Sequence, residues 1–80
     1  MNTNDNKYTD FGERLSRIMY KQNITNIELA GKMYVSPSTI SGYRTGRRSP
    51  TVADLAALTK ILHVSADYLI GNIDNEKAPF

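Results

Sequence analysis

Apolar residues recur along most of the chain at the spacing of α-helices, and no segment alternates apolar and polar residues over the length of a strand. The first apolar stripe consists of Phe11, Leu15, Ile18 and Met19, which share one face of a helix predicted over residues 11–22. The other predicted helices cover about 26–33, 36–45, 52–62 and 66–70. Five short helices joined by short connections predict an all-α fold class.

Polar residues near the predicted helix boundaries match known capping signals. Asp10 is predicted to cap the first helix, with Glu13 completing a capping box. Thr25 and Glu28 repeat this spacing at the start of the second helix. Asn23 tolerates the left-handed backbone conformation and is predicted to end the first helix.

The segment from Asn26 to Arg48 is predicted to form two short helices with a tight turn between them. In the first of these helices, the predicted inward residues are Ile27, Ala30 and Met33, with Leu29 partly inward. Tyr34 and Val35 form the predicted turn, with Val35 packing inward.

The second helix of this pair carries a small, polar outer face. It begins at the N-cap Ser36, with Pro37 at the first helical position, and ends at the left-handed residue Gly46. The predicted inward residues are Ile40 and Tyr43, and the predicted outward residues are Ser38, Thr39, Ser41, Gly42 and Thr45. Gly42 costs about 1 kcal/mol relative to alanine in a helix. It indicates either a close approach of the backbone to a partner or plain tolerance of that cost.

The charge is distributed unevenly, although the net charge is only +2. Residues 1–28 carry four basic and four acidic residues, residues 29–53 carry four basic residues and no acidic one, and residues 54–80 carry two basic and four acidic residues. A basic middle segment indicates a polyanionic partner, with chance clustering of solvated charges as the alternative. Small outward side chains, a preformed helix start and this local charge favour a helix that lies in a DNA groove.

The composition excludes several classes of site. The chain contains no cysteine, and a single histidine, His63, does not make a metal site. No apolar run approaches the length of a membrane span and the N-terminus is polar, which predicts a cytoplasmic protein without a membrane partner. The serines have no base in reach by sequence, and neither a Gly-rich phosphate loop nor a paired-carboxylate motif occurs. We therefore expect no cofactor and no enzymatic activity.

A series of short motifs occurs in a fixed order along the chain. They are Leu29-Ala30, Val35-Ser36, Ser38-Thr39-Ile40-Ser41 and Gly46, then Pro50, then the ending Leu62-His63-Val64-Ser65-Ala66-Asp67-Tyr68-Leu69. This set resembles the phage-repressor (Cro/CI, XRE) helix-turn-helix family, whose closing motif is LGVSxDxL. The resemblance covers about residues 10–71 and depends on the whole set in order, because each piece alone is common.

The resemblance implies a compact, lambda-repressor-like bundle of five helices, with residues 36–45 as the recognition helix in the major groove. It also implies a sequence-specific, DNA-binding transcriptional regulator that binds operator DNA as a homodimer, such as a phage or mobile-element repressor. The chain departs from the family pattern at Asn26, which is often Gln, and at Tyr34, which is often Gly. Several phage repressors pair an Arg with a Glu where this chain has Met19 and Arg44, so Arg44 is predicted to be free for DNA.

The predicted DNA-binding residues are Asn26, Lys32, Ser36, Pro37, Ser38, Thr39, Ser41, Gly42, Arg44, Thr45, Arg47 and Arg48. Phosphate contacts are expected from Arg44, Arg47 and Arg48 at one end of the recognition helix, and from Asn26 and Lys32 on the other side. Arg44 is the only long side chain on that helix and is predicted to contact a guanine or a nearby phosphate. Serines discriminate poorly between bases, so DNA shape and deformability are predicted to carry a sizeable share of the specificity.

The predicted organisation is a disordered N-terminus (1–9), the DNA-binding domain (10–71) and a C-terminal tail (72–80). The acidic C-terminal third, with the apolar Ile70, Ile73 and Phe80, is the candidate dimer surface, and a free tail is the alternative for 72–80. The alternative function is a protein-binding helix-turn-helix module, such as an antitoxin or antirepressor partner. The sequence fits a complete small Cro-like protein or part of a longer repressor.

Overall fold

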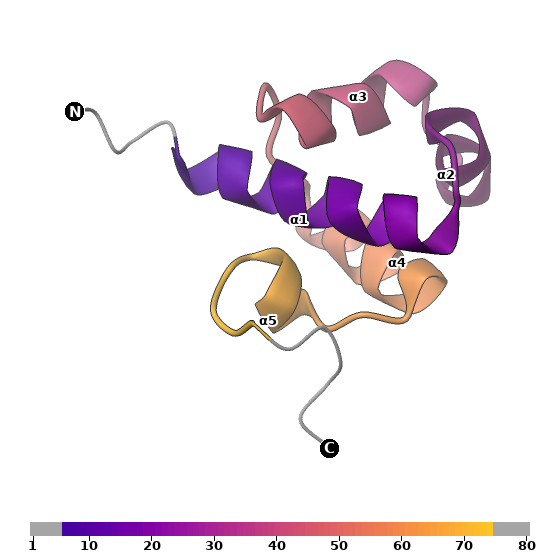
Figure 1. Cartoon of the computed structure of the whole chain (residues 1–80). Coiled ribbons are helices and arrows are strands. Elements are labelled where there is room, and N and C mark those ends of the chain that lie inside the picture. Colours follow the sequence, from indigo (N-terminus) through magenta and orange to yellow (C-terminus); the bar gives the residue numbers. More distant parts are fainter. Residues whose placement is uncertain (1–5, 75–80) are drawn as a thin grey trace.

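The computed structural model describes the backbone of residues 6–74 and the side chains of residues 10–74. This part of the chain contains five α-helices and no strand: α1 (Asn6–Gln22), α2 (Asn26–Met33), α3 (Pro37–Thr45), α4 (Val52–Leu62) and α5 (Ala66–Leu69). In Figure 1, α1 crosses the middle of the bundle, with α3 above it and α4 and α5 below it. The predicted all-α class and the bundle of five helices are confirmed. None of the described helices is long and apolar enough to cross a membrane.

Side-chain caps begin the helices after α1 where the sequence predicts them. At α2, the Thr25 hydroxyl accepts a hydrogen bond from the Glu28 N–H at 3.1 Å, and the Glu28 carboxylate accepts one from the Thr25 N–H at 2.9 Å. This donation to the carboxylate lowers the pKa of Glu28. Ser36, Thr51 and Ser65 cap α3, α4 and α5 in the same way.

The start of α1 differs from the prediction. The helix begins at Asn6, so the predicted start near residue 11, with a capping box of Asp10 and Glu13, is wrong. Because the helix already continues before Asp10, the N–H groups that a cap would satisfy have intrahelical partners. The Asp10 carboxylate instead accepts a hydrogen bond from Arg14 Nε, one turn later, at 3.2 Å. Of the predicted disordered N-terminus, residues 6–9 are helical, and residues 1–5 lie outside the described part.

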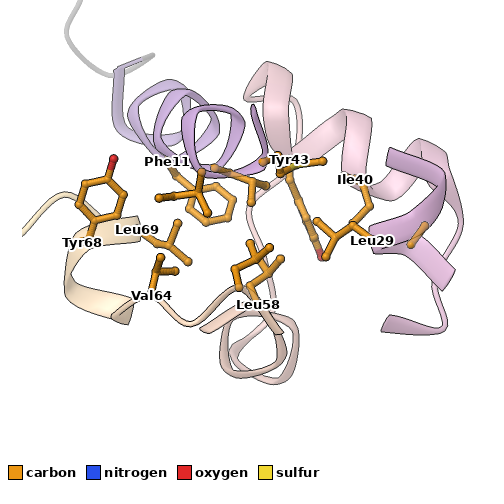
Figure 2. Close-up of a cluster of buried hydrophobic side chains, with 13 residues drawn as sticks. Phe11, Leu29, Ile40, Tyr43, Leu58, Val64, Tyr68 and Leu69 are labelled. Carbon is orange, nitrogen blue, oxygen red and sulfur yellow. The ribbon is translucent and has the colours of Figure 1, made fainter. Parts of the chain in front are cut away.

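A single apolar core joins all five described helices (Figure 2). Its buried members are Phe11, Leu15, Ile18, Met19, Leu29, Ala30, Ile40, Tyr43, Leu58, Leu62, Val64, Tyr68 and Leu69. The apolar stripe predicted for the first helix is thus fully buried, Tyr43 is a core residue as predicted, and Tyr68 belongs to the core as well. This core fixes α3 against α1 and α2, the two helices with which it makes its main contacts.

The inward face of α2 differs from the prediction at two residues. Leu29 is fully buried, whereas Ile27 is 73% exposed. Each residue turns a helix by about 100°, so these two side chains lie about 160° apart around α2. Once Leu29 and Ala30 fill the core, Ile27 has to point away from it.

Tyr43 links α3 to two other helices. Its ring meets Phe11 of α1 edge-on, with the ring centroids 6.1 Å apart and the planes at 73°. Its hydroxyl donates a hydrogen bond to Asp54 Oδ2 of α4 at 2.5 Å. Burial of the ring, together with this bond to a carboxylate, raises the pKa of Tyr43 to about 12.

The stability of the fold is therefore expected to fall as the pH rises from about 10 toward 12. Tyr43 loses its proton near pH 10 in the unfolded chain and near 12 in the folded chain. The unfolded state thus binds fewer protons in this window, which lowers the free energy of unfolding as the pH increases. Urea unfolding at several pH values measures this, and Tyr43→Phe should show a shallower decline. Identical declines for both proteins would contradict the assignment.

Within residues 6–74, three residues other than glycine adopt the left-handed conformation: Asn23, Tyr34 and His63, with φ of 57°, 59° and 58°. Asn23 follows α1, as predicted, and His63 caps the end of α4. Tyr34 lies in the turn between α2 and α3 and adopts the left-handed backbone conformation that is easy for glycine, the residue often found at this position in the family. A left-handed residue with a side chain costs roughly 1–2 kcal/mol, and the packing of the two helices offsets that cost.

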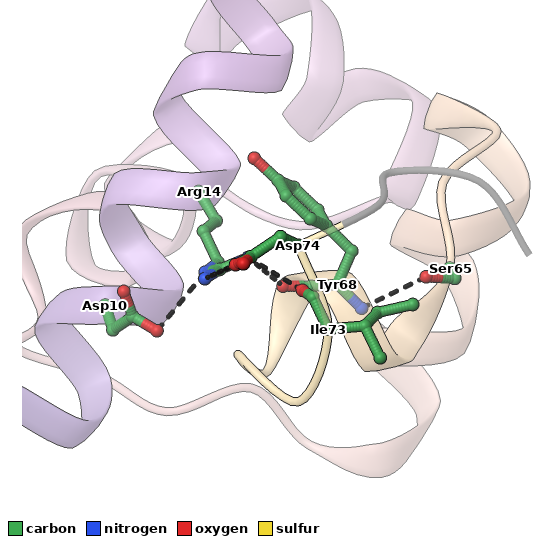
Figure 3. A network of polar contacts seen from close by, with 6 residues as sticks. All are labelled: Asp10, Arg14, Ser65, Tyr68, Ile73 and Asp74. Carbon is green, nitrogen blue, oxygen red and sulfur yellow. Dashed lines mark hydrogen bonds and ion pairs between the residues drawn. The ribbon is translucent and has the colours of Figure 1, made fainter.

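Arg14 fastens the C-terminal part of the described chain to α1 (Figure 3). Its Nη1 donates to the carbonyl oxygens of Tyr68 and Ile73 at 3.2 and 3.0 Å, and its Nη2 pairs with Asp74 at 3.2 Å. The guanidinium also lies 4.8 Å from the centroid of the Tyr68 ring. The folded unit therefore extends to Asp74, beyond the predicted boundary at residue 71, while residues 75–80 of the predicted tail lie outside the described part.

Candidate DNA-binding surface

The helix α3 is defined at both ends by local signals in the sequence. The Ser36 hydroxyl accepts a hydrogen bond from the Thr39 N–H at 3.3 Å, and Pro37 occupies the first turn. Gly46 ends the helix with φ of 83°. The predicted length and capping of this helix are confirmed.

The side of α3 away from the core is small and polar. Ile40 and Tyr43 are buried on the inner side, as predicted. The predicted outward residues divide into three groups: Ser38 and Thr45 are exposed, Thr39 and Ser41 are half-buried, and Gly42 is buried. Ser36 and Pro37, at the start of the helix, are exposed as well. Gly42 is buried because the side chain of Arg48 lies against it.

Arg44 has two partners within the chain, whereas the sequence predicts none; its contact with DNA stays a prediction. Its Nε donates a hydrogen bond to Ser16 Oγ of α1 at 2.9 Å, and its Nη1 donates to Asn26 Oδ1 of α2 at 2.5 Å. The family position in α1 is Met19, which offers no acceptor, but a hydroxyl and an amide oxygen nearby accept from the guanidinium instead. Arg44 therefore braces the end of α3 against α1 and α2.

The start of α2 lies beside this brace. Asn26 is half-buried, and because its Oδ1 accepts from Arg44, its amide nitrogen is left to donate elsewhere. The positive end of the α2 dipole and the half-buried Arg44 guanidinium both favour an anion at this position. The arrangement brings Asn26 and Arg44 together as one unit, whereas the sequence placed them on separate sides of the DNA contact.

The other basic residues of the surface are accessible to solvent. Lys32 lies in the last turn of α2, and Arg47 and Arg48 follow α3. All three are exposed, and no acidic residue occurs between positions 29 and 53. Exposed cations on a rigid scaffold suit contacts with phosphate groups.

Sequence reasoning missed three residues of this region. Ser16 forms the anchor of the Arg44 brace, and the only signal for it is a polar residue one turn before Met19. Tyr20 and Ile27 are exposed apolar residues, 87% and 73% accessible. They flank an open groove of about 450 Å³, which Arg44 also lines, between the end of α1 and the start of α2.

The helix-turn-helix family model matches residues 14–69, more than half of the chain. The chain therefore belongs to this family, in its phage-repressor (Cro/CI, XRE) branch. The match begins within α1 and ends at the last residue of α5, so it includes the second half of α1 and all of α2 to α5.

Two curated relatives are transcriptional regulators. The chain is 32% identical over 66 residues to the HTH-type transcriptional regulator ImmR of Bacillus subtilis (strain 168), covering 82% of this chain and 52% of ImmR. It is 31% identical over 61 residues to the HTH-type transcriptional activator BcrR of Enterococcus faecalis, covering 76% of this chain and 30% of BcrR. The chain thus spans about half or less of the length of these relatives.

A solved structure of similar fold is that of the P22 c2 repressor protein in complex with synthetic operator 9T. It superposes with a TM-score of 0.75 at 32% sequence identity, covering 79% of this chain and 96% of that chain. A repressor whose structure contains operator DNA therefore shares this arrangement of helices.

Proposed function

We propose that this protein is a sequence-specific transcriptional regulator of the phage or mobile-element repressor type, which acts by binding double-stranded operator DNA rather than by catalysis. The observation that carries this proposal is the outer side of α3, which is small, polar and exposed on a helix held rigidly by a buried core. Similarity to the P22 c2 repressor and to the regulators ImmR and BcrR supports it.

In this binding mode, α3 lies in the major groove and the basic residues contact the phosphates on either side. Lys32 and Arg47 supply charge, and Asn26 donates its amide N–H at the start of α2. Ser38, Ser41 and Thr45 reach the base edges only with short side chains that discriminate weakly. DNA shape therefore carries a sizeable share of the specificity.

The protein binds its operator as a homodimer in this proposal, with the surface around α5 as the contact between copies. Ile70, just after α5, is 48% exposed and is available for such a contact. Ile73 packs against the core of its own chain and is not spare, and Phe80 lies outside the described residues. A palindromic pair of half-sites selected from random DNA would support the dimer, and a single half-site would contradict it.

Fluorescence anisotropy with a labelled pool of mixed duplex DNA, measured across a salt series, tests the proposal. We expect binding to weaken steeply with salt, because phosphate contacts release counterions. Arg47→Ala should weaken binding to all sequences alike and reduce the salt slope by about 1. Lys60→Ala removes the same charge from the exposed surface of α4, on the other side of α1 in Figure 1, and should leave both quantities unchanged.

Absence of binding even at low salt would contradict the proposal. The alternative function, a protein-binding helix-turn-helix module such as an antitoxin or antirepressor partner, would then be favoured. Under that alternative, neutralising Arg47 leaves the partner bound.

A further inference from the structure

Gly42 faces outward on α3 and is nevertheless buried. At about 100° per residue, it lies about 160° around the helix from the core residue Ile40, so the core does not cover it. A Cβ atom placed on Gly42 would have Arg48 atoms as its three nearest neighbours, Cδ at 2.9 Å, Cγ at 3.0 Å and Cβ at 3.5 Å. The stem of Arg48 therefore occupies the space that a side chain at position 42 would fill.

Arg48 is held along α3 at two points. Its backbone N–H donates a hydrogen bond to the Gly42 carbonyl at 3.1 Å, which folds the loop after Gly46 back onto the helix. Its guanidinium Nη1 donates to Thr39 Oγ1 at 3.3 Å, one turn before Gly42. The Arg48 side chain thus runs backward from the loop and ends beside the first half of α3.

The path of the Arg48 side chain places a long cationic group on the outer face of α3, where the residues of the helix itself offer none. Ser38, Ser41 and Thr45 are short, and Arg44 is held by Ser16 and Asn26. The Arg48 side chain is exposed, and Thr39 engages one of its five N–H donors. The remaining donors are available to two parallel acceptors, which is the pattern that a guanine presents in the major groove.

We infer that Arg48 is a specificity-determining residue of this protein that reads a guanine in the major groove, and that Gly42 is the positioning residue that seats it on the recognition helix. The inference rests on the proposed function. It changes the role expected for Arg48 from a phosphate contact in the loop to a base contact on the face of α3.

The test begins with an operator selected by the wild-type protein from a random duplex pool, followed by replacement of every base pair in turn. We expect the wild type to lose roughly 5- to 150-fold in affinity when the guanine is replaced. Arg48→Ala should abolish that difference while keeping the preferences at other positions. Arg47→Ala, the matched control, should lower the affinity for all these DNAs by the same factor.

Gly42→Ala separates the position of Arg48 from its charge. The new Cβ displaces the Arg48 stem without changing the net charge, and alanine is the better helix former. We expect an equal or higher melting temperature together with a lost or shifted preference at the same base pair as in Arg48→Ala. A purely structural role for Gly42 would leave this preference in place.

Two outcomes would overturn the inference while leaving DNA binding intact. One is a uniform loss of affinity in Arg48→Ala, like that of Arg47→Ala. The other is an unchanged base preference in Gly42→Ala. Absence of wild-type binding to the pool would instead overturn the proposed function itself.

Discussion

Replacing Gly12 with alanine is expected to lower the free energy of unfolding by about 3 kcal/mol. Gly12 lies where α1 crosses the last turn of α3, and it is buried there. An added Cβ would lie 2.7 Å from the carbonyl oxygen of Tyr43 and would collide with the carbonyl oxygen of Arg44 as well. Both obstacles are backbone atoms, so no change of rotamer relieves them, and α1 has to move away from α3.

Gly31→Ala is the matched control for this substitution. Gly31 is also inside a helix, but it is exposed and a Cβ atom there would meet nothing within 4 Å. This variant gains helix propensity without a clash, so its free energy of unfolding should rise by about 1 kcal/mol. Urea unfolding followed by circular dichroism compares the two variants with the wild type. Effects of the same sign at both glycines would contradict the close crossing of α1 and α3.

The sequence predicts the parts of this fold that depend on local chemistry. Ser36 with Pro37 places the start of α3, because a cap and a proline act within one turn of the chain. The apolar stripe of α1 can be predicted from the helical spacing of its residues alone. Glycine and asparagine after helices mark their ends, and His63 occupies the same kind of position.

The parts that were mispredicted or missed depend on partners far away in the sequence. The helical spacing of α1 gives no sign that Gly12 touches the backbone of α3. Arg44 has no charged partner at the family position, yet Ser16 and Asn26, 28 and 18 residues away, engage it. For Gly42, the sequence alone allows either a close approach of the backbone to a partner or plain tolerance of its cost. The structure shows a close approach, but by Arg48 of the same chain.

Asn26→Asp is the substitution whose effects on fold stability and on DNA binding should differ most strongly, because Asn26 is the acceptor that holds Arg44 in its brace. The aspartate carboxylate would replace the Asn26 amide, whose oxygen already accepts from Arg44 at 2.5 Å. A hydrogen bond from the guanidinium to a carboxylate is stronger than one to a neutral amide oxygen. A negative charge at the start of α2 also complements the helix dipole. We therefore expect the free energy of unfolding to stay the same or rise by about 1 kcal/mol.

The same substitution should weaken DNA binding roughly 10- to 100-fold, because it places a carboxylate opposite the phosphate that Asn26 contacts in the proposed binding mode. Asn26→Ala is the control, since it removes the amide donor without adding charge, and its loss of affinity should be smaller. The repulsion is screened by salt, so the affinities of the two variants should converge as the ionic strength rises. Wild-type affinity in Asn26→Asp would show that no phosphate lies at the start of α2. A stable variant with weak, salt-sensitive binding would mean that Arg44 braces the fold while Asn26, which it holds, contacts the DNA.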